Sequence, residues 1–151
     1  DQKIKDVPYW ITSGNFVNIR DFYKVGQMNE SLFIDYVDFD LGYRFKQANL
    51  KIGYLPGYCI LHTIGNPIEI QFLGKTFYAL NHSPIRYYYR YRNSYYLYHY
   101  VDKKFFKKEY HREIFGSLIK MILFEKNRKE KLKMIKKGIQ DAKLNHLGKF
   151  E

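Results

Sequence analysis

The segment Leu32-Phe33-Ile34-Asp35-Tyr36-Val37-Asp38-Phe39-Asp40-Leu41 decides how the rest of the chain is interpreted. From its middle onward, apolar or aromatic side chains recur at the spacing of one helix face, at Val37, Leu41, Phe45 and Ala48. This pattern predicts a helix over Tyr36–Ala48 that begins among three closely spaced carboxylates.

Short runs of β-forming residues flank this helix on both sides. They predict strands at Tyr9–Thr12, Phe16–Ile19, Lys51–Leu55 and Tyr58–His62. A turn at Ser13-Gly14-Asn15 separates the first two strands, a short helix is predicted over Asp21–Val25, and Ile64–Phe77 is predicted as a loop. Because strands alternate with helices, we expect an α/β fold.

From Ser83 onward the pattern is helical. Ser83 suits an N-cap and Pro84 the first helical position. Three helices are predicted, at residues 83–100, 105–124 and 127–144. We therefore expect residues 1–82 to form an α/β part and residues 83–151 to form a basic α-helical extension.

The formal net charge of +11 is unevenly distributed. Residues 1–85 hold eight basic and eight acidic side chains, whereas residues 86–137 hold sixteen basic and five acidic ones. Cys59 is the single cysteine, which excludes an internal disulfide and a cysteine-based zinc site. The start DQKIKDVPYW lacks the apolar core of a signal peptide, and we interpret it as the interior of a longer protein.

The carboxylates of Asp35, Asp38 and Asp40 are the first candidates for chemistry. A carboxylate beside apolar side chains and other acids tends to have a raised pKa, which suits a general base. Alternatively, acids gather at a helix N-terminus because the helix dipole favours them there. Asp38-Phe39-Asp40 also spells the metal-chelating pattern D-x-D, but residues two apart on a helix cannot share one ion.

His62 is the second candidate, because it closes a predicted strand. Ligands gather at the carboxyl ends of strands in open α/β sheets, where a neutral imidazole can bind a divalent metal. The alternative is a hydrogen-bonded structural histidine.

The order of these and neighbouring motifs resembles that of a known family. The motifs are Ser13-Gly14-Asn15, Val25-Gly26, the segment Leu32–Leu41 with Arg44, Ile52–Pro56, His62, His82-Ser83-Pro84 and Tyr89–Asn93. Their order resembles that of family-2 (GT-A type) glycosyltransferases and is closest to that of bacterial rhamnosyltransferases and related polymerising galactofuranosyltransferases. The resemblance implies that this chain is the C-terminal half of a GT-A-like nucleotide-sugar transferase domain. It implies an inverting transfer of a sugar, with rhamnose expected, to a cell-surface polysaccharide or lipid-linked acceptor.

The resemblance also assigns roles to individual residues. Asp38 matches the catalytic base, although the preceding acidic position of the family is Val37 here. His62 matches a ligand of the Mg2+ or Mn2+ that bridges the donor diphosphate, with a donor such as dTDP-rhamnose. Trp10, Ser13, Gly14, Asn15, Asp35 and Asp40 are expected beside the donor and acceptor. The nucleotide-binding half of the family, with its D-x-D, is not among these residues, so the chain alone is expected to be inactive.

The basic extension raises separate hypotheses. Arg86, Arg90 and, more weakly, Arg92 could contact a diphosphate; alternatively, they form structural ion pairs on a packing helix. The cations and apolar stripes of residues 103–137 predict peripheral binding at the inner face of the cytoplasmic membrane, with self-association competing for the same surface. A module that binds nucleic acid or an anionic membrane without catalysis remains the alternative, although no nucleic-acid-binding motif supports it.

Overall fold

The computed structural model describes residues 3–61, 67–72 and 74–150. The chain divides into two compact units, one covering Asp1–His62 with Gly148–Glu151 and the other covering Thr63–Leu147. This division comes earlier than the expected boundary at residue 82. The reason is local packing: the ring of Phe77 lies 5.4 Å from that of Phe124, and the backbone N–H of Asn81 donates to Glu125.

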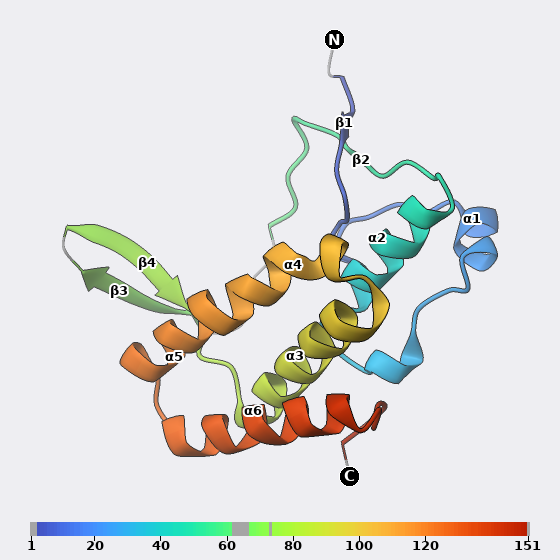
Figure 1. Ribbon diagram of the computed structural model, residues 1–151. Helices are drawn as coiled ribbons and strands as arrows, with labels where there is room; N and C mark the ends of the chain where they lie inside the picture. Colours follow the sequence, from blue (N-terminus) through green and yellow to red (C-terminus); the bar gives the residue numbers. More distant parts are fainter. Residues whose placement is uncertain (1–2, 62–66, 73, 151) are drawn as a thin grey trace. The chain divides into compact units, whose positions relative to one another are not determined.

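The first unit contains short elements joined by long connections (Figure 1). Strand β1 (Lys5–Asp6) pairs antiparallel with β2 (Gly53–Tyr54), with Lys5 opposite Tyr54. Its helices are α1 (Ile19–Lys24), the 3-10 turn η1 (Glu30–Leu32) and α2 (Val37–Gln47). The predicted helices at Asp21–Val25 and Tyr36–Ala48 are therefore confirmed to within two residues.

The predicted strands of this unit are mostly wrong. Tyr9–Thr12, Phe16–Ile19 and the described residues of Tyr58–His62 are not strands, and of Lys51–Leu55 only Gly53–Tyr54 pairs. The side chains of Phe16 and Leu61 are almost fully exposed, so the apolar character of these runs is not used to cover a sheet. Among the described residues, the chain forms two separate two-stranded sheets and no larger one.

Helix α2 carries the core of the first unit. Leu41 and Phe45 on this helix are buried together with Leu32 and Tyr36 before it. Gly42 permits a close crossing, because a Cβ atom there would lie 2.7 Å from Tyr9 Cβ. The N-terminal segment can therefore lie directly on the helix backbone.

The second unit begins with a hairpin where a loop was predicted. Strand β3 (Ile68–Phe72) pairs antiparallel with β4 (Lys75–Ala79), and Gly74 adopts a positive φ of 72° in the turn. The loop prediction for Ile64–Phe77 is thus wrong over the described strand residues. Glycine is common in irregular loops, but here it permits the tight turn between two strands.

The three predicted helices of the second unit are confirmed, with π-helical turns inside two of them. The elements are α3 (Pro84–Tyr96), η2 (Leu97–Val101), α4 (Lys103–His111), η3 (Arg112–Ser117), α5 (Leu118–Phe124) and α6 (Arg128–Lys143). Figure 1 shows α3 and α6 lying against each other. Tyr87, Tyr91, Met121 and Ile135 form the core between these helices.

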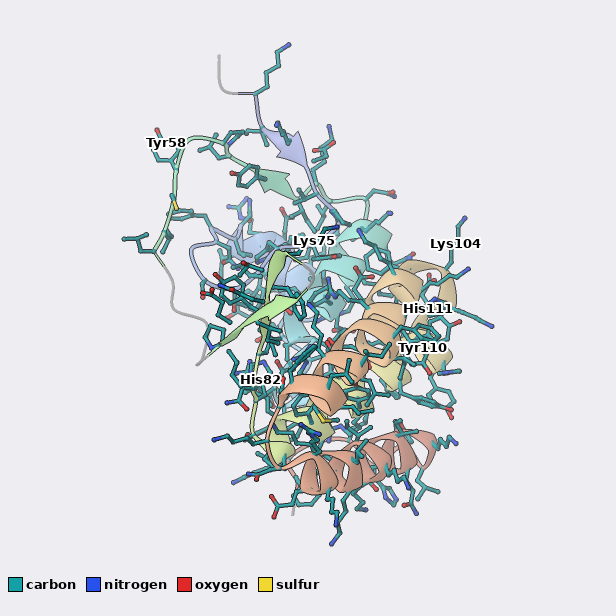
Figure 2. All side chains as sticks on the ribbon, turned by 90° about the vertical axis from the view of Figure 1, so that its left-hand side faces the viewer. Tyr58, Lys75, His82, Lys104, Tyr110 and His111 are labelled. Carbon is teal, nitrogen blue, oxygen red and sulfur yellow. The ribbon has the colours of Figure 1, made fainter. Side chains whose placement is uncertain are left out.

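Aromatic rings also pack together between the last turn of α3 with η2 and the helix α4. Tyr98 and Tyr110 stack with their ring centroids 4.3 Å apart, and Tyr95 stacks on His99 at 4.1 Å. Tyr110 and the neighbouring His111 project from the last turn of α4 (Figure 2). In the described part of the chain, no helix combines the length and the apolar character needed to cross a membrane.

Candidate functional site

The acidic segment lies where η1 leads into α2, and its backbone is unusual. Asn29 Oδ1 accepts hydrogen bonds from the Ser31 N–H at 3.2 Å and the Ser31 hydroxyl at 2.6 Å, which fixes the start of η1. Phe33, Asp35 and Tyr36 then adopt positive φ angles of 62°, 61° and 67°. Side chains other than glycine rarely adopt this conformation, and such strain tends to accumulate at functional sites.

Asp38 lies in the first turn of α2 and is half-buried. Burial raises the pKa of Asp38 above its ordinary value, and the nearby charge of Asp35 adds a smaller increase. The N–H of Phe39 donates to Asp38 Oδ1 at 3.0 Å and lowers the pKa in part. The prediction that like charges raise a pKa here is confirmed, although burial is the larger cause. A carboxylate whose pKa is shifted toward neutrality is suited to accept a proton from a hydroxyl.

Asp40 lies on the same helix but is committed to a structural network. Arg44 Nε donates to its Oδ2 at 2.9 Å, and Arg44 Nη1 donates to the carbonyl of Val25 at 2.5 Å. Burial raises the pKa of Asp40, while the charge and hydrogen bond of Arg44 and a hydrogen bond with Asn29 lower it. This network ties α2 to the loop after α1, so donor or acceptor contact by Asp40 stays a prediction that would require the network to open.

The described residues do not by themselves form a metal site. No group of three histidine, cysteine, aspartate or glutamate side chains converges in the part of the chain that the structure describes. The segment Asp38–Asp40 is helical, as expected, with Asp40 bound to Arg44, so these two carboxylates do not fit one ion. His62, the predicted metal ligand, lies outside the described residues.

Trp10 and the following turn are placed by α2 and by the chain before β3. The indole of Trp10 contacts the ring of Phe45 edge-on at 5.3 Å, and within the described residues its buried Nε1 has no hydrogen-bond acceptor. Gly14 has a φ of 72° and lies against the side chain of Ile60. Ser13 is exposed, and Asn15 donates to the carbonyl of Ile11 at 3.4 Å. Ligand contact by this turn stays a prediction.

The arginines of α3 differ from one another in their surroundings. Arg90 Nη2 forms an ion pair with Glu113 at 2.6 Å and donates to Ser117 Oγ at 3.2 Å, with both charged side chains buried. Arg92 is almost fully buried and donates to Asn93 at 2.9 Å, whereas Arg86 is half-buried. The structure thus shows the packing alternative for Arg90 and Arg92, and phosphate contact by all three stays a prediction.

Several residues of these networks were missed at the sequence level. The Asp40–Arg44 pair could have been found from its i, i+4 spacing within a predicted helix. The buried acids Glu113 and Glu125 could not, since they lie in a segment that reads as a solvated basic face. Their burial depends on how separate helices pack.

Comparison with known proteins gives one relevant similarity. The chain is 33% identical over 129 residues to the protein described as dTDP-rhamnosyl transferase RfbF of Shigella flexneri, an alignment that covers 85% of this chain and 42% of that protein. No protein-family profile matches the chain. No solved structure matches it either. At the level of a rhamnosyltransferase-like glycosyltransferase, the similarity confirms the resemblance seen in the motifs.

Proposed function

We propose that this chain forms the acceptor side of a glycosyltransferase that moves rhamnose from dTDP-rhamnose to a growing cell-surface polysaccharide or a lipid-linked acceptor. The observation that carries the proposal is the 129-residue similarity to a dTDP-rhamnosyl transferase. The family-2 class and the GT-A-like fold belong to the same proposal and rest on the motif order from Trp10 to Asn93.

In the proposed reaction, Asp38 is the general base. Its carboxylate takes the proton of an acceptor hydroxyl while that oxygen attacks the anomeric carbon of the donor. The bond between that carbon and the diphosphate breaks, its electron pair leaves with dTDP, and the configuration inverts. A positioned base typically contributes about 10²- to 10⁴-fold to such a step. The raised pKa of Asp38 supports this role, because a more basic carboxylate holds the transferred proton better.

We further propose that nucleotide recognition uses sequence that this chain does not contain. The chain spans 42% of the length of the relative that it matches, which supports this division. A divalent cation, Mg2+ or Mn2+, would belong to that shared site with His62 as the ligand from this chain.

We also propose that the enzyme acts while bound to the inner face of the cytoplasmic membrane. Phe115, Ile119, Ile122 and Leu123 are exposed on η3 and α5 and form an apolar stripe. Lys120 and Lys126 are exposed beside it, a combination typical of helices that bind an anionic lipid surface.

The test is an Asp38→Asn substitution in the full-length protein, with transfer of labelled rhamnose from dTDP-rhamnose as the measurement. We expect turnover to fall by about 10²-fold or more, with donor binding retained. Asp21→Asn on α1 is the matched control and should remain active. Near-normal activity of the Asp38 variant would remove this residue as the base, and absence of rhamnosyl transfer by the unmodified protein would remove the function.

A further inference from the structure

A hollow in the second unit is not used by the function proposed above. It has a volume of about 320 Å³ and lies between the end of β4, α3 and the continuous helix formed by η3 and α5. This volume is at the lower end of the range for small-molecule sites, about 300–1,000 Å³. All of its lining residues belong to one compact unit.

The lining combines three cations with one buried acid that is already bound. It includes Arg90, Arg112, Lys120, Ser117, Gly116 and Glu125. The Glu125 carboxylate accepts from Tyr87 Oη at 2.8 Å, from the Asn81 N–H at 3.0 Å and from Lys131 Nζ at 2.7 Å. Its charge is therefore balanced by Lys131 outside the lining, and it does not dominate the pocket.

The mouth of the hollow is positively charged. Arg112 and Lys120 are exposed, whereas Arg90 is buried at the base beside Glu113. Ser117 Oγ accepts a hydrogen bond from Arg90, and its hydroxyl hydrogen can still be donated. A guanidinium, an ammonium and a hydroxyl around one small hollow are the groups that bind phosphate oxygens best.

The π-helical turn η3 explains why these side chains share one face. In a π-helix the backbone hydrogen bond joins residues five apart, so Arg112 and Ser117 lie on the same side. Gly116 lies between them and has no side chain to fill the hollow. A Cβ atom there would meet nothing closer than Arg112 Cγ at 3.8 Å. Single π-turns inside helices frequently occur at functional sites.

We propose that this hollow binds a phosphate or diphosphate group, through Arg112 and Lys120 at its mouth and Arg90 and Ser117 at its base. The group is carried by a soluble small molecule or by a lipid. The exposed stripe from Phe115 to Leu123 runs along the same helix, so both sources can reach the hollow. The inference is independent of the transfer reaction, because binding is measured without turnover.

The first experiment titrates inorganic pyrophosphate into the full chain by calorimetry and compares two double variants. Arg112→Gln/Lys120→Gln removes both cations at the mouth, whereas Lys133→Gln/Lys136→Gln removes two exposed cations of α6. We expect the first to weaken binding by about tenfold or more and the second by less than about threefold. Equal losses would indicate general attraction to a basic protein and would overturn the proposal, as would no binding by the unmodified chain.

The second experiment fills the hollow without changing the charge. Gly116→Leu should abolish pyrophosphate binding while thermal unfolding shows a folded chain, and Gly116→Ala should retain most of it. Unchanged affinity of a folded Gly116→Leu variant would place the anion elsewhere and overturn the proposal.

The third experiment identifies the source of the phosphate. Vesicles with phosphatidic acid, which carries a phosphate monoester, are compared with phosphatidylserine vesicles of equal charge. If phosphatidic acid binding is selectively lost in Gly116→Leu and is competed by pyrophosphate, the hollow takes a lipid phosphate. If the Gly116 variant binds both vesicles normally but has lost pyrophosphate, the hollow takes a soluble one.

Discussion

Lys131 of α6 and Glu125 at the end of α5 form an ion pair of 2.7 Å in which both side chains are almost fully buried. Glu125 is also the acceptor for Tyr87 of α3 and for the backbone of Asn81 after β4. One carboxylate therefore connects α3, α5, α6 and the segment after β4. Hydrogen bonding of its oxygens offsets the cost of removing two charges from water.

The Lys131→Met variant should lose much of its stability. Removing one partner leaves a buried charge without its counter-ion, which typically costs about 3–5 kcal/mol. Lys137→Met is the matched control, because Lys137 pairs with Asp141 at the same distance but has a side chain that is 48% exposed. Asp141 is buried, but Tyr88 Oη still donates to it, and Lys137 itself is partly solvated, so we expect a loss of only about 1 kcal/mol. Chemical denaturation measures both, and equal losses would contradict the role given to burial.

Gly138→Ala should strain the contact between α3 and α6 and lower the stability of the second unit. A Cβ atom at Gly138 would collide with the carbonyl oxygen of Tyr88 and lie 3.3 Å from Arg92 N, both in the backbone of α3. We expect a loss of about 1–3 kcal/mol, typical of overpacking. Gly116→Ala is the control, since it meets only a side-chain atom and should gain about 0.5–1 kcal/mol in helix propensity. Similar changes for both glycines in a denaturant titration would contradict this packing.

Asp38→Asn should raise the melting temperature at pH 7 while it lowers activity. The folded pKa of Asp38 is above its ordinary value, so ionisation of this group costs stability as the pH rises from about 4 through the folded pKa. Asparagine removes that cost and can still accept from the Phe39 N–H. The gain should vanish toward about pH 3, where both proteins are neutral at this position. A variant that melts lower at pH 7 would indicate a structural carboxylate.

Asp141 should make the second unit sensitive to acid. Burial alone would raise its pKa, but hydrogen bonds from Lys137 and Tyr88, and the charges of Lys137 and His146, lower it below the ordinary value. The stabilisation is complete above about pH 4 and is lost as the pH falls through the lowered folded pKa. Asp141→Asn should therefore destabilise at pH 7 and differ little near pH 2. Thermal unfolding across this range checks it, and a difference independent of pH would contradict it.

Loss of the apolar stripe should weaken membrane association. Phe115→Ser/Ile119→Ser should reduce co-sedimentation with anionic vesicles by about tenfold, since each side chain would bury apolar area in the lipid. Leu144→Ser, an exposed leucine after α6, is the control. If the unmodified chain is a dimer that the double variant dissociates, and vesicle binding is absent, the stripe is a self-association surface instead.

The helices could be predicted from the sequence because their determinants are local. The apolar spacing of α2, and Ser83-Pro84 before α3, act within a few residues, and the structure agrees with both. Strands depend on a partner elsewhere in the chain. Tyr9–Thr12 has strand composition without a partner strand among the described residues, whereas Ile68–Phe72 pairs with Lys75–Ala79 despite its loop-like context.

The site was predictable only where the chemistry is local. Burial, the larger cause of the raised pKa of Asp38, depends on packing, but the smaller increase comes from Asp35, which is close in sequence. The surroundings of Arg90 could not be predicted in this way. Its partner Glu113 lies on another helix, and the π-turn η3 determines where the Glu113 side chain points. The arginines of α3 suggest one anion site from their sequence spacing, but in the structure Arg90 and Arg92 are buried and Arg86 is half-buried.

The backbone N–H of Gly148 donates to the carbonyl of Ser31 at 2.6 Å, within the first unit. Residue 148 is synthesised after residue 31 and after all the described helices of the second unit. The turn that precedes the acidic segment therefore gains its hydrogen bond from Gly148 only after the helices of the second unit have been translated. A product that ends before residue 148 would therefore lack this hydrogen bond next to the proposed catalytic segment.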